Sequence, residues 1–502
     1  MSNRIWIDIE DLFVYRSFGV RLSGIQRLEF ELCRALAALP QSKGRVFFVR
    51  HDLERECLIT VPWEDVEAAF SVMRGEGRGS LACSTKEPLP EQPGAEPRPG
   101  IRTIARSLLK KTFYALPPSL RSIAVAQLAV FLAIATLVRA QAVRLAAALK
   151  PRQRSQNGAA AVPCARPVAG LRETSDYFAA TARQGDILAA LGSPWIRADY
   201  SRYLEKAVRE RGLCFALLIY DIIPVRRPEW MEQGLARTFR AWLDAALPLA
   251  DRLLTISMAT ATDVGAYARN AGLALRAVPT PIPIGTGFKK SDRARSAADV
   301  SSRLPAPNSY ALVVSTIEAR KNHLLLFRVW RHLLEDMSPD SVPTLVFAGR
   351  IGWLVSDFME QLRNTNFLDG KIIHIDSPTD QELEALYDGC LFTLFPSLYE
   401  GWGLPVTESL AFGRPCIVSK TTSLPEAGGS LARYIDPDNT TDAYRVIRET
   451  IEDRAGLRAW RERVRREFKP VEWSESARAV LRMLDICQDA SAPGEMKLRR
   501  SA

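Results

Sequence analysis

Two glutamates, Glu400 and Glu408, stand with seven residues between them in the segment LFPSLYEGWGLPVTESLAFGRPCIVS, residues 394–419. An apolar run precedes them, and the Gly-Trp-Gly turn predicts a short helix with Pro405 in its first turn and Gly413 just past its end. Free amides at a helix start bind phosphate, whereas carboxylates accept hydrogen bonds from sugar hydroxyls. We therefore expect the amides of residues 401–404 and the two glutamates to hold different parts of one ligand.

A second segment, STIEARKNH (residues 315–323), follows another predicted strand and contains Arg320 and Lys321. An arginine fork beside a lysine point charge suits a pyrophosphate. Ligands of open α/β sheets bind at the carboxyl ends of the strands, where both segments are expected. A solvated basic pair and surface glutamates are the alternatives, and the joint occurrence on one edge favours a site for a nucleotide diphosphate sugar.

Short apolar runs alternate with helical patterns along the chain, which indicates parallel sheets covered on both faces. The expected strands lie at residues 4–13, 45–50, 185–193, 213–221, 251–257, 310–316, 344–349, 371–376, 390–397 and 415–419. The fold class is therefore α/β, with two Rossmann-like doubly wound domains facing a cleft. We expect a first, acceptor-binding domain over residues 1–285, a linker over 286–308 and a second, donor-binding domain over 309–470.

An insert of about residues 71–183 interrupts the first domain and holds the excess basicity. The chain carries a net charge of +10, and residues 97–172 contain thirteen Lys and Arg but no Asp or Glu. Subtracting those thirteen charges from +10 leaves −3 for the rest of the chain. Residues 101–150 are helical in character, and their apolar run of residues 123–138 is shorter than the ~20 residues of a membrane span.

Such an insert is typical of a peripheral contact with an anionic membrane. The alternative is a helical hairpin that packs on its own domain and turns its basic face to solvent. Because the basicity is confined to it, we expect no nucleic acid partner. The eight cysteines are scattered singly and there are only four histidines, so we expect neither a disulfide framework nor a metal site. The acidic N-terminal stretch MSNRIWIDIEDLF lacks the features of a secretion signal, which predicts a cytoplasmic protein.

Four segments together resemble a known family. EGWGLPVTE looks like the paired-glutamate motif of retaining glycosyltransferases of family 4, which have the GT-B fold. STIEARKN resembles their diphosphate-binding segment, with Ser315 where the family often has glycine. LIYDIIPVRRPEW (residues 218–230) and SGIQRLEFEL (residues 23–32) are similar to segments of bacterial polysaccharide mannosyltransferases, with Tyr220 where many members have histidine.

The resemblance implies a role for each matching residue. Arg320 and Lys321 would clamp the leaving diphosphate, Glu408 would hold the ribose and Glu400 the donor hexose, while Asp221 is a candidate catalytic or acceptor-binding group or a strand-end cap. It also implies that a C-terminal helix, over residues 471–490, crosses back onto the first domain. The donor-binding residues expected in this way are Gly24, Arg320, Lys321, Glu400, Gly401, Trp402, Gly403, Leu404 and Glu408.

We therefore expect a retaining hexosyltransferase without cofactor or metal, with GDP-mannose as the first candidate donor and a UDP-sugar as the alternative. Its acceptor would be a lipid-linked glycan of cell-surface polysaccharide synthesis, at the cytoplasmic face of the inner membrane. A glycosidase also uses two carboxylates, but the basic pair has no part in that chemistry. An oxidoreductase lacks its GxGxxG motif here, and a non-catalytic membrane-associated assembly component remains the other reading.

Overall fold

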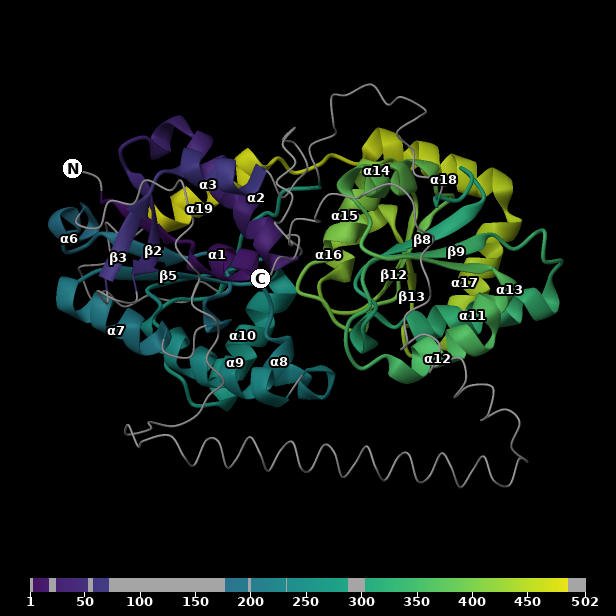
Figure 1. The fold of residues 1–502 in the computed structure, drawn as a ribbon, viewed down its shortest axis with the longest axis horizontal. Helices are drawn as coiled ribbons and strands as arrows, with labels where there is room; N and C mark the ends of the chain where they lie inside the picture. The colour runs from purple at the N-terminus through teal and green to yellow at the C-terminus, as the bar shows by residue number, and fades with distance from the viewer. Residues whose placement is uncertain are drawn as a thin grey trace, which may run out of the picture. The chain divides into compact units, whose positions relative to one another are not determined.

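The computed structural model describes residues 3–17, 24–52, 57–71, 177–196, 200–231, 233–287 and 303–485, all within one compact unit. Their strands form two separate sheets (Figure 1). We call the described residues up to 287 the first lobe and those from 303 to 470 the second lobe. The basic segment of residues 97–172 and most of the expected linker lie outside the described residues.

The first lobe contains a seven-stranded sheet of order β3-β2-β1-β4-β5-β6-β7. Its strands are β1 (Ile5–Asp8), β2 (Val46–Asp52), β3 (Cys57–Val61), β4 (Ile187–Ala190), β5 (Cys214–Ile219), β6 (Arg252–Thr255) and β7 (Thr280–Pro281). Its helices are α1 (Glu10–Ser17), α2 (Ile25–Ala38), α3 (Trp63–Ser71), α6 (Tyr177–Thr181), α7 (Tyr200–Arg211), α8 (Ile223–Arg226), α9 (Gln233–Ala246) and α10 (Met258–Asn270).

Both faces of this sheet are buried. Ile5 and Ile7 of β1 belong to one apolar cluster, and Trp6 between them belongs to the cluster on the other face. Successive side chains of a strand point to opposite faces, so helices must cover both sides. This explains why the strands read as continuous apolar runs in the sequence.

The second lobe contains a six-stranded sheet of order β10-β9-β8-β11-β12-β13, in which the neighbouring strands pair in parallel. Its strands are β8 (Tyr310–Val314), β9 (Thr344–Ala348), β10 (Ile372–Ile375), β11 (Thr393–Phe395), β12 (Cys416–Ser419) and β13 (Arg433–Ile435). Its helices are α11 (His323–Asp336), α12 (Ser356–Asn364), α13 (Asn366–Asp369), α14 (Asp380–Gly389), α15 (Leu404–Ala411), α16 (Leu424–Gly428), α17 (Thr440–Glu452) and α18 (Arg454–Glu467). The prediction of two doubly wound α/β domains is confirmed.

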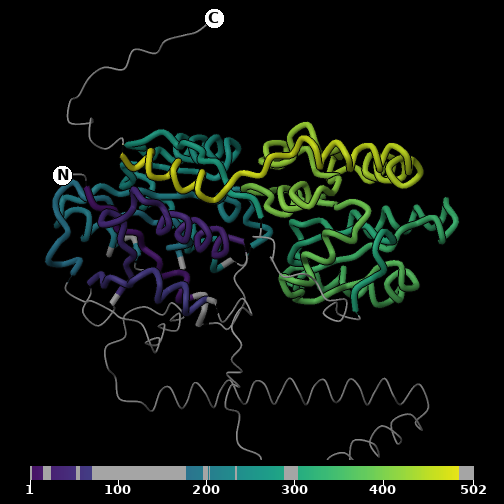
Figure 2. Tube along the Cα trace, turned by 90° about the horizontal axis from the view of Figure 1, so that it is seen from above, coloured from purple at the N-terminus to yellow at the C-terminus, as the bar shows by residue number. Residues whose placement is uncertain are grey.

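Helix α19 (Trp473–Asp485) follows the second lobe in the chain but packs on the first. Its apolar face, with Ala477, Val480 and Leu484, belongs to the core cluster that contains β1 and α2. Figure 2 shows this helix in yellow alongside the first lobe. Residues 473–485 therefore complete the core of the first lobe, although the second lobe precedes them in the chain.

Two expectations for the first sheet are wrong. The expected strand of residues 4–13 ends at Asp8, because the Asp8 carboxylate accepts a hydrogen bond from the backbone N–H of Glu10 (3.1 Å) and α1 begins there. The sheet is also not fully parallel, since β3 pairs antiparallel with β2 at one edge. An antiparallel edge strand on an otherwise parallel sheet is common in large sheets.

Candidate functional site

The two segments that the sequence singled out follow neighbouring strands. Arg320 and Lys321 lie in a single 3₁₀ turn (Ala319–Lys321) between β8 and α11, and Glu400 lies in the loop between β11 and α15. In the second sheet, β8 and β11 are adjacent and the strand order reverses between them. Ligands of open α/β sheets bind outside the carboxyl ends of the strands at such a reversal. Both segments therefore meet where this fold places ligands.

The cations and the first glutamate of the motif are in direct contact. Arg320 Nη1 lies 2.7 Å from Glu400 Oε2, and Lys321 Nζ lies 2.6 Å from Glu400 Oε1. Arg320 Nη2 also pairs with Glu318 Oε1 at 2.7 Å. Glu318 is 4% exposed and Glu400 is 8% exposed. The site thus holds two cations against two carboxylates with little access to water.

This burial makes the charges depend on one another. Burial alone would raise the pKa of Glu400, but the charges of Arg320 and Lys321 outweigh it and lower that pKa to about 2. Burial opposes the charge on Arg320, yet the carboxylates of Glu400 and Glu318 raise its pKa. Burial and the neighbouring Arg320 lower the pKa of Lys321. An additional anion, such as a diphosphate, would therefore stabilise the charged form of Lys321.

The loop after β12 holds the turn of residues 401–403 in place. Ser423 Oγ lies 2.9 Å from the carbonyl oxygens of both Glu400 and Trp402, which share its single O–H donor. Gly403 is the N-cap of α15 with φ +117°, a conformation that side chains with a Cβ rarely adopt. Pro405 stands in the first turn of the helix and Gly413, with φ +67°, follows its end. The predicted helix is present, and its first amides have no side-chain cap.

Glu408 lies inside α15 and does not join the cluster around Arg320. Its Oε2 accepts a hydrogen bond from Tyr387 Oη of α14 at 2.9 Å, and its side chain is 6% exposed. Burial raises the pKa of Glu408, and the charge of Arg27 in α2 opposes that rise. Because Arg27 acts on Glu408, the start of α2 lies close to this part of α15.

Gly24 is the residue just before α2, with φ +54° and open space where its Cβ would be. Among the described residues, none would contact a Cβ at this position.

Asp221 lies beside the site at the carboxyl end of β5. Removal from water raises the pKa of Asp221, and the positive charge of Arg320 opposes the rise. Its Oδ1 also accepts a hydrogen bond from the backbone N–H of Ile223 (3.0 Å), which is the capping role left open by the sequence. A Cβ at Gly401 would collide with the carbonyl oxygen of Tyr220, so only glycine lets the turn approach this strand end.

Glu318 is the site residue that the sequence reasoning missed. It stands two positions before Arg320 in the quoted segment, and an acid beside two adjacent cations was the available signal. Within the residues that the structure describes, no group of three or more His, Cys, Asp or Glu could hold a metal ion.

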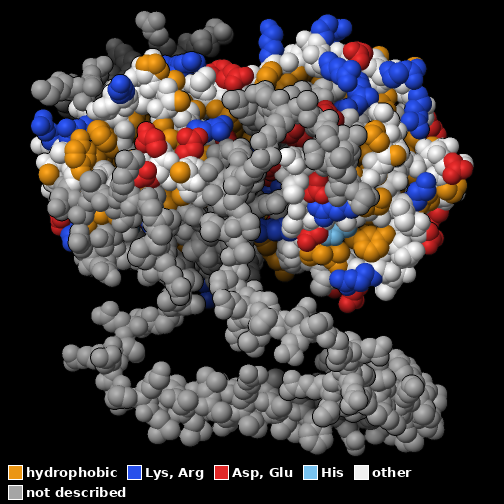
Figure 3. All heavy atoms as spheres, turned by 45° about the horizontal axis from the view of Figure 1, so that its top comes forward, with side chains coloured by type: hydrophobic (Ala, Val, Ile, Leu, Met, Phe, Trp, Pro, Cys, Tyr) orange, Lys and Arg blue, Asp and Glu red, His pale blue; other side chains and the backbone are white. Residues whose placement is uncertain are grey.

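The described surface is mixed in charge. Figure 3 shows Lys and Arg side chains together with Asp and Glu side chains across the visible face of both lobes. Among the described helices, none combines the length and the apolar character that crossing a bilayer requires.

Comparisons with known proteins agree with this geometry. Residues 295–467 match the family model "Glycosyl transferases group 1". The chain is 27% identical over 303 residues to the serotype-specific mannosyltransferase WbdA of Escherichia coli, which covers 57% of this chain but 35% of WbdA. It is also 27% identical over 280 residues to the O-antigen chain mannosyltransferase B of Escherichia coli, covering 53% of this chain and 69% of that protein.

Among solved structures, Anabaena HepE in complex with UDP-glucose overlaps 60% of this chain and 79% of its own, with a TM-score of 0.46 and 16% identity. The chain spans about a third of the length of the WbdA proteins that it matches. The described residues form two doubly wound lobes, and the second of them matches the family model. These two findings confirm the fold class that the resemblance implied. Residues 295–467 of this chain, which span most of the second lobe, match the glycosyl transferases group 1 model.

Proposed function

We propose that this protein is a retaining glycosyltransferase of bacterial polysaccharide synthesis that moves mannose from GDP-mannose to a lipid-linked glycan. The names of the matching proteins, a serotype-specific mannosyltransferase and an O-antigen chain mannosyltransferase, support the sugar and the class of acceptor. A nucleotide diphosphate sugar is the donor, and neither a cofactor nor a metal takes part in the proposed reaction.

The contact of Arg320 and Lys321 with Glu400 carries the proposal. An arginine fork and a lysine at the carboxyl edge of a doubly wound sheet suit a diphosphate, and the amides at the start of α15 add further donors. In the structure both cations pair with Glu400 at 2.6–2.7 Å. A bound diphosphate would become their partner instead, which would free the Glu400 carboxylate to accept hydrogen bonds from the donor sugar.

The same groups account for catalysis. Negative charge accumulates on the diphosphate as the bond to the sugar breaks, and fixed cations in a water-poor site stabilise that charge. Glu400 and Glu408 would position the donor, and Asp221 would lie near the acceptor side of the reacting carbon. The acceptor hydroxyl then attacks the sugar carbon from the face that the diphosphate leaves and gives its proton to the departing diphosphate, which retains the configuration of the sugar.

A donor screen tests this function. Purified protein is incubated with GDP-mannose, UDP-glucose or UDP-galactose plus a membrane lipid extract, and sugar transfer to lipid is followed for the wild type and Glu400→Ala. Glu360→Gln is the matched control, because Glu360 is an exposed acid of the same lobe. We expect transfer from GDP-mannose that is lost in Glu400→Ala and unchanged in the control.

Transfer from a UDP-sugar alone would replace the donor and keep the reaction class. If the wild type neither binds a nucleotide nor transfers any sugar while a suitable lipid acceptor is present, the protein is better described as an assembly component without catalysis.

The basic segment of residues 97–172 supports a peripheral position on the cytoplasmic face of the inner membrane, where a lipid-linked acceptor is found. Deleting this segment is expected to release the protein from vesicles that contain anionic lipid. Unchanged sedimentation with such vesicles would remove the segment from the proposal.

A further inference from the structure

Ser315 is the first residue after β8, at the carboxyl end of a strand where the order of the second sheet reverses. Its backbone packs closely on the end of β9, because its N–H donates to the carbonyl oxygen of Ala348 (3.1 Å) and a Cβ at Gly349 would collide with its own carbonyl oxygen. Its side chain is half-buried. The Ser315 hydroxyl therefore lies at the sheet edge where doubly wound domains bind ligands, in the loop that leads to Arg320 and Lys321.

The partner of this hydroxyl is His323, the first residue of α11. Ser315 Oγ lies 3.3 Å from His323 Nε2, and within the described part of the chain neither side chain has another hydrogen-bond partner. His323 is 2% exposed and packs edge-on against Phe347, with 4.8 Å between the ring centroids. Burial, together with the nearby charge of Lys321, lowers the pKa of His323 to about 3. The imidazole is therefore neutral at neutral pH.

The surroundings of the ring indicate which of its nitrogens carries the proton. A neutral imidazole has one N–H donor and one acceptor nitrogen, and Nδ1 of His323 has no partner among the described residues. A proton on Nδ1 would bury a donor without an acceptor, which is rare in proteins. A proton on Nε2 leaves only a lone pair at Nδ1 and lets Nε2 donate to Ser315 Oγ. The Ser315 hydroxyl then accepts from His323, and its own hydrogen is left for another acceptor.

The neighbouring charges indicate what that acceptor is. The charge of Lys321 acts on His323, so the lysine lies near the imidazole that holds Ser315. Arg320 and Lys321 attract anions, and a hydroxyl hydrogen beside two cations suits a group that accepts hydrogen bonds without donating any. A diphosphate combines both properties, because its oxygens carry negative charge and accept hydrogen bonds.

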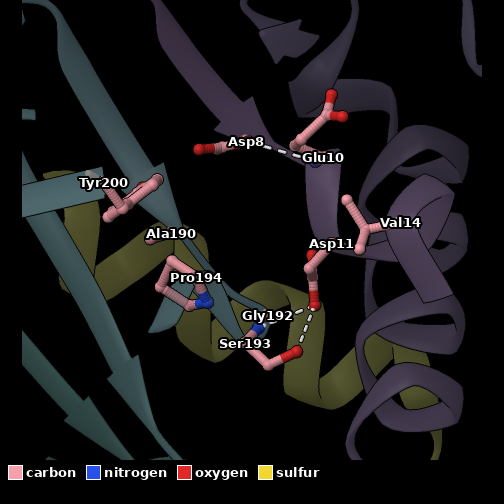
Figure 4. A pocket seen from close by; sticks show the side chains of 9 residues that line it. All are labelled: Asp8, Glu10, Asp11, Val14, Ala190, Gly192, Ser193, Pro194 and Tyr200. Atoms are coloured by element: carbon pink, nitrogen blue, oxygen red, sulfur yellow. Dashed lines mark hydrogen bonds between the residues drawn. The ribbon is translucent and has the colours of Figure 1, made fainter. Parts of the chain in front are cut away.

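The corresponding reversal of the first sheet, between β1 and β4, does not suit a diphosphate. A small pocket at this point, which we call the acidic pocket, is lined by Asp8, Glu10 and Asp11 among other residues (Figure 4). Figure 4 shows Ser193 beside Asp11, whose Oδ2 lies 2.7 Å from both the N–H and the Oγ of Ser193. Asp11 also shares a hydrogen bond with buried Glu29. Here the serine hydroxyl already serves a carboxylate, and the acids would repel a diphosphate.

We propose that Ser315 is a further donor-binding residue, whose hydroxyl donates a hydrogen bond to the diphosphate of the nucleotide sugar. His323 is the positioning residue that directs this hydroxyl, because it occupies the oxygen from the protein side and leaves the hydrogen for the ligand. The inference rests on the proposed transfer reaction and names a contact of its donor site. A glycine at position 315 would bind the diphosphate without this contact.

Calorimetric titration of the full-length protein with GDP, UDP and inorganic diphosphate tests the contact. The variants are Ser315→Ala, His323→Phe and the double variant, and Ser338→Ala, at an exposed serine of the same lobe, is the control. Thermal unfolding verifies that each variant is folded. NMR of the wild type with ¹⁵N-labelled histidine shows which ring nitrogen of His323 carries the proton, and this measurement needs no variant.

The nucleotide that binds the wild type is expected to bind Ser315→Ala about ten times more weakly, because a hydrogen bond to a charged group is lost. Inorganic diphosphate should lose affinity by a similar factor, and the control should match the wild type. His323→Phe should weaken binding when Ser315 is present and have no further effect in the double variant, because His323 acts through the hydroxyl. The NMR spectrum should place the proton on Nε2.

Equal nucleotide affinity of wild type and Ser315→Ala overturns the contact. Inorganic diphosphate that does not bind the wild type, or that binds wild type and Ser315→Ala equally, also overturns it. An effect of His323→Phe that persists in the double variant, or a proton on Nδ1, refutes the positioning role, because a structural histidine would act in both backgrounds. A wild type that binds no nucleotide refutes the proposed function and this inference with it, whereas unchanged nucleotide binding by Ser315→Ala refutes this inference alone.

Discussion

Replacing Glu400 with glutamine removes one negative charge from between Arg320 and Lys321 while keeping the size of the side chain. A carboxyl group whose pKa falls from 4.5 to about 2 on folding stabilises the folded protein by about 3 kcal/mol at neutral pH. The side chain is 8% exposed, so solvent screening of this interaction is small. We expect Glu400→Gln to lower the free energy of unfolding at pH 7 by about 3 kcal/mol.

The lowered pKa of Glu400 also predicts how the difference in unfolding free energy between wild type and Glu400→Gln varies with pH. Because the pKa of Glu400 is lower in the folded protein, its stabilisation is complete above pH 4.5 and is lost as the pH falls toward about 2. At pH 3, about half of the difference between wild type and variant should remain. The variant should also bind GDP or UDP at least as tightly as the wild type, since the diphosphate no longer competes with a carboxylate for the two cations.

Guanidinium unfolding of wild type, Glu400→Gln and the exposed control Glu360→Gln at pH 7 and pH 3 measures these differences. A variant within 0.5 kcal/mol of the wild type at pH 7, or a difference that does not change with pH, would refute the idea that Glu400 is held as a buried anion. Weaker nucleotide binding by Glu400→Gln would refute the exchange of partners proposed for Arg320 and Lys321.

Three further substitutions test the surroundings of the site. Gly403→Ala should destabilise the protein by about 1–3 kcal/mol in thermal unfolding, because φ is +117° there and a Cβ would lie 2.8 Å from Leu424 Cδ2; an unchanged Tm would contradict this. Tyr387→Phe leaves buried Glu408 without its 2.9 Å donor and should cost about 1–3 kcal/mol, with weaker GDP binding in calorimetry as a second readout. Burial lowers the pKa of His323 from 6.5 to about 3. Between pH 7.5 and pH 4.5 the free energy of unfolding of the wild type should therefore fall by about 3 kcal/mol more than that of His323→Phe. If the two free energies fell in parallel with pH, the imidazole would not be kept neutral in the folded protein.

The second lobe was largely predictable because its local signals agree with one another. A continuous apolar strand, a glycine turn and a proline in the first helical turn identify the start of α15 without tertiary information. The contact between Lys321 and Glu400 was not predicted, because it depends on the adjacency of β8 and β11, which are separated by two other strands in the chain. The hydrogen bond from Tyr387 to Glu408 was not predicted either, because it joins two helices, α14 and α15, whose packing the sequence does not reveal.

The acidic pocket of the first lobe was missed for a different reason. Glu29 is buried in α2 together with the apolar residues Leu28 and Leu32. A charged residue inside an apolar stripe is a signal that sequence alone offers. The surroundings of Glu29 could not be predicted, because Asp11 and Gly192 lie beside it only when β1 and β4 pair. The strand limits were also too long, since a side-chain hydrogen bond to the backbone ended β1 at Asp8.

The charged side chains differ in sign between the two points at which the strand order reverses. At β8 and β11 the cations are Arg320 and Lys321, which are largely buried and paired with Glu400, and two cations favour a diphosphate. At β1 and β4 the side chains are Asp11 and its acidic neighbours, which disfavour one. In the proposed reaction the diphosphate of the donor would therefore bind at the second lobe, beside Arg320 and Lys321.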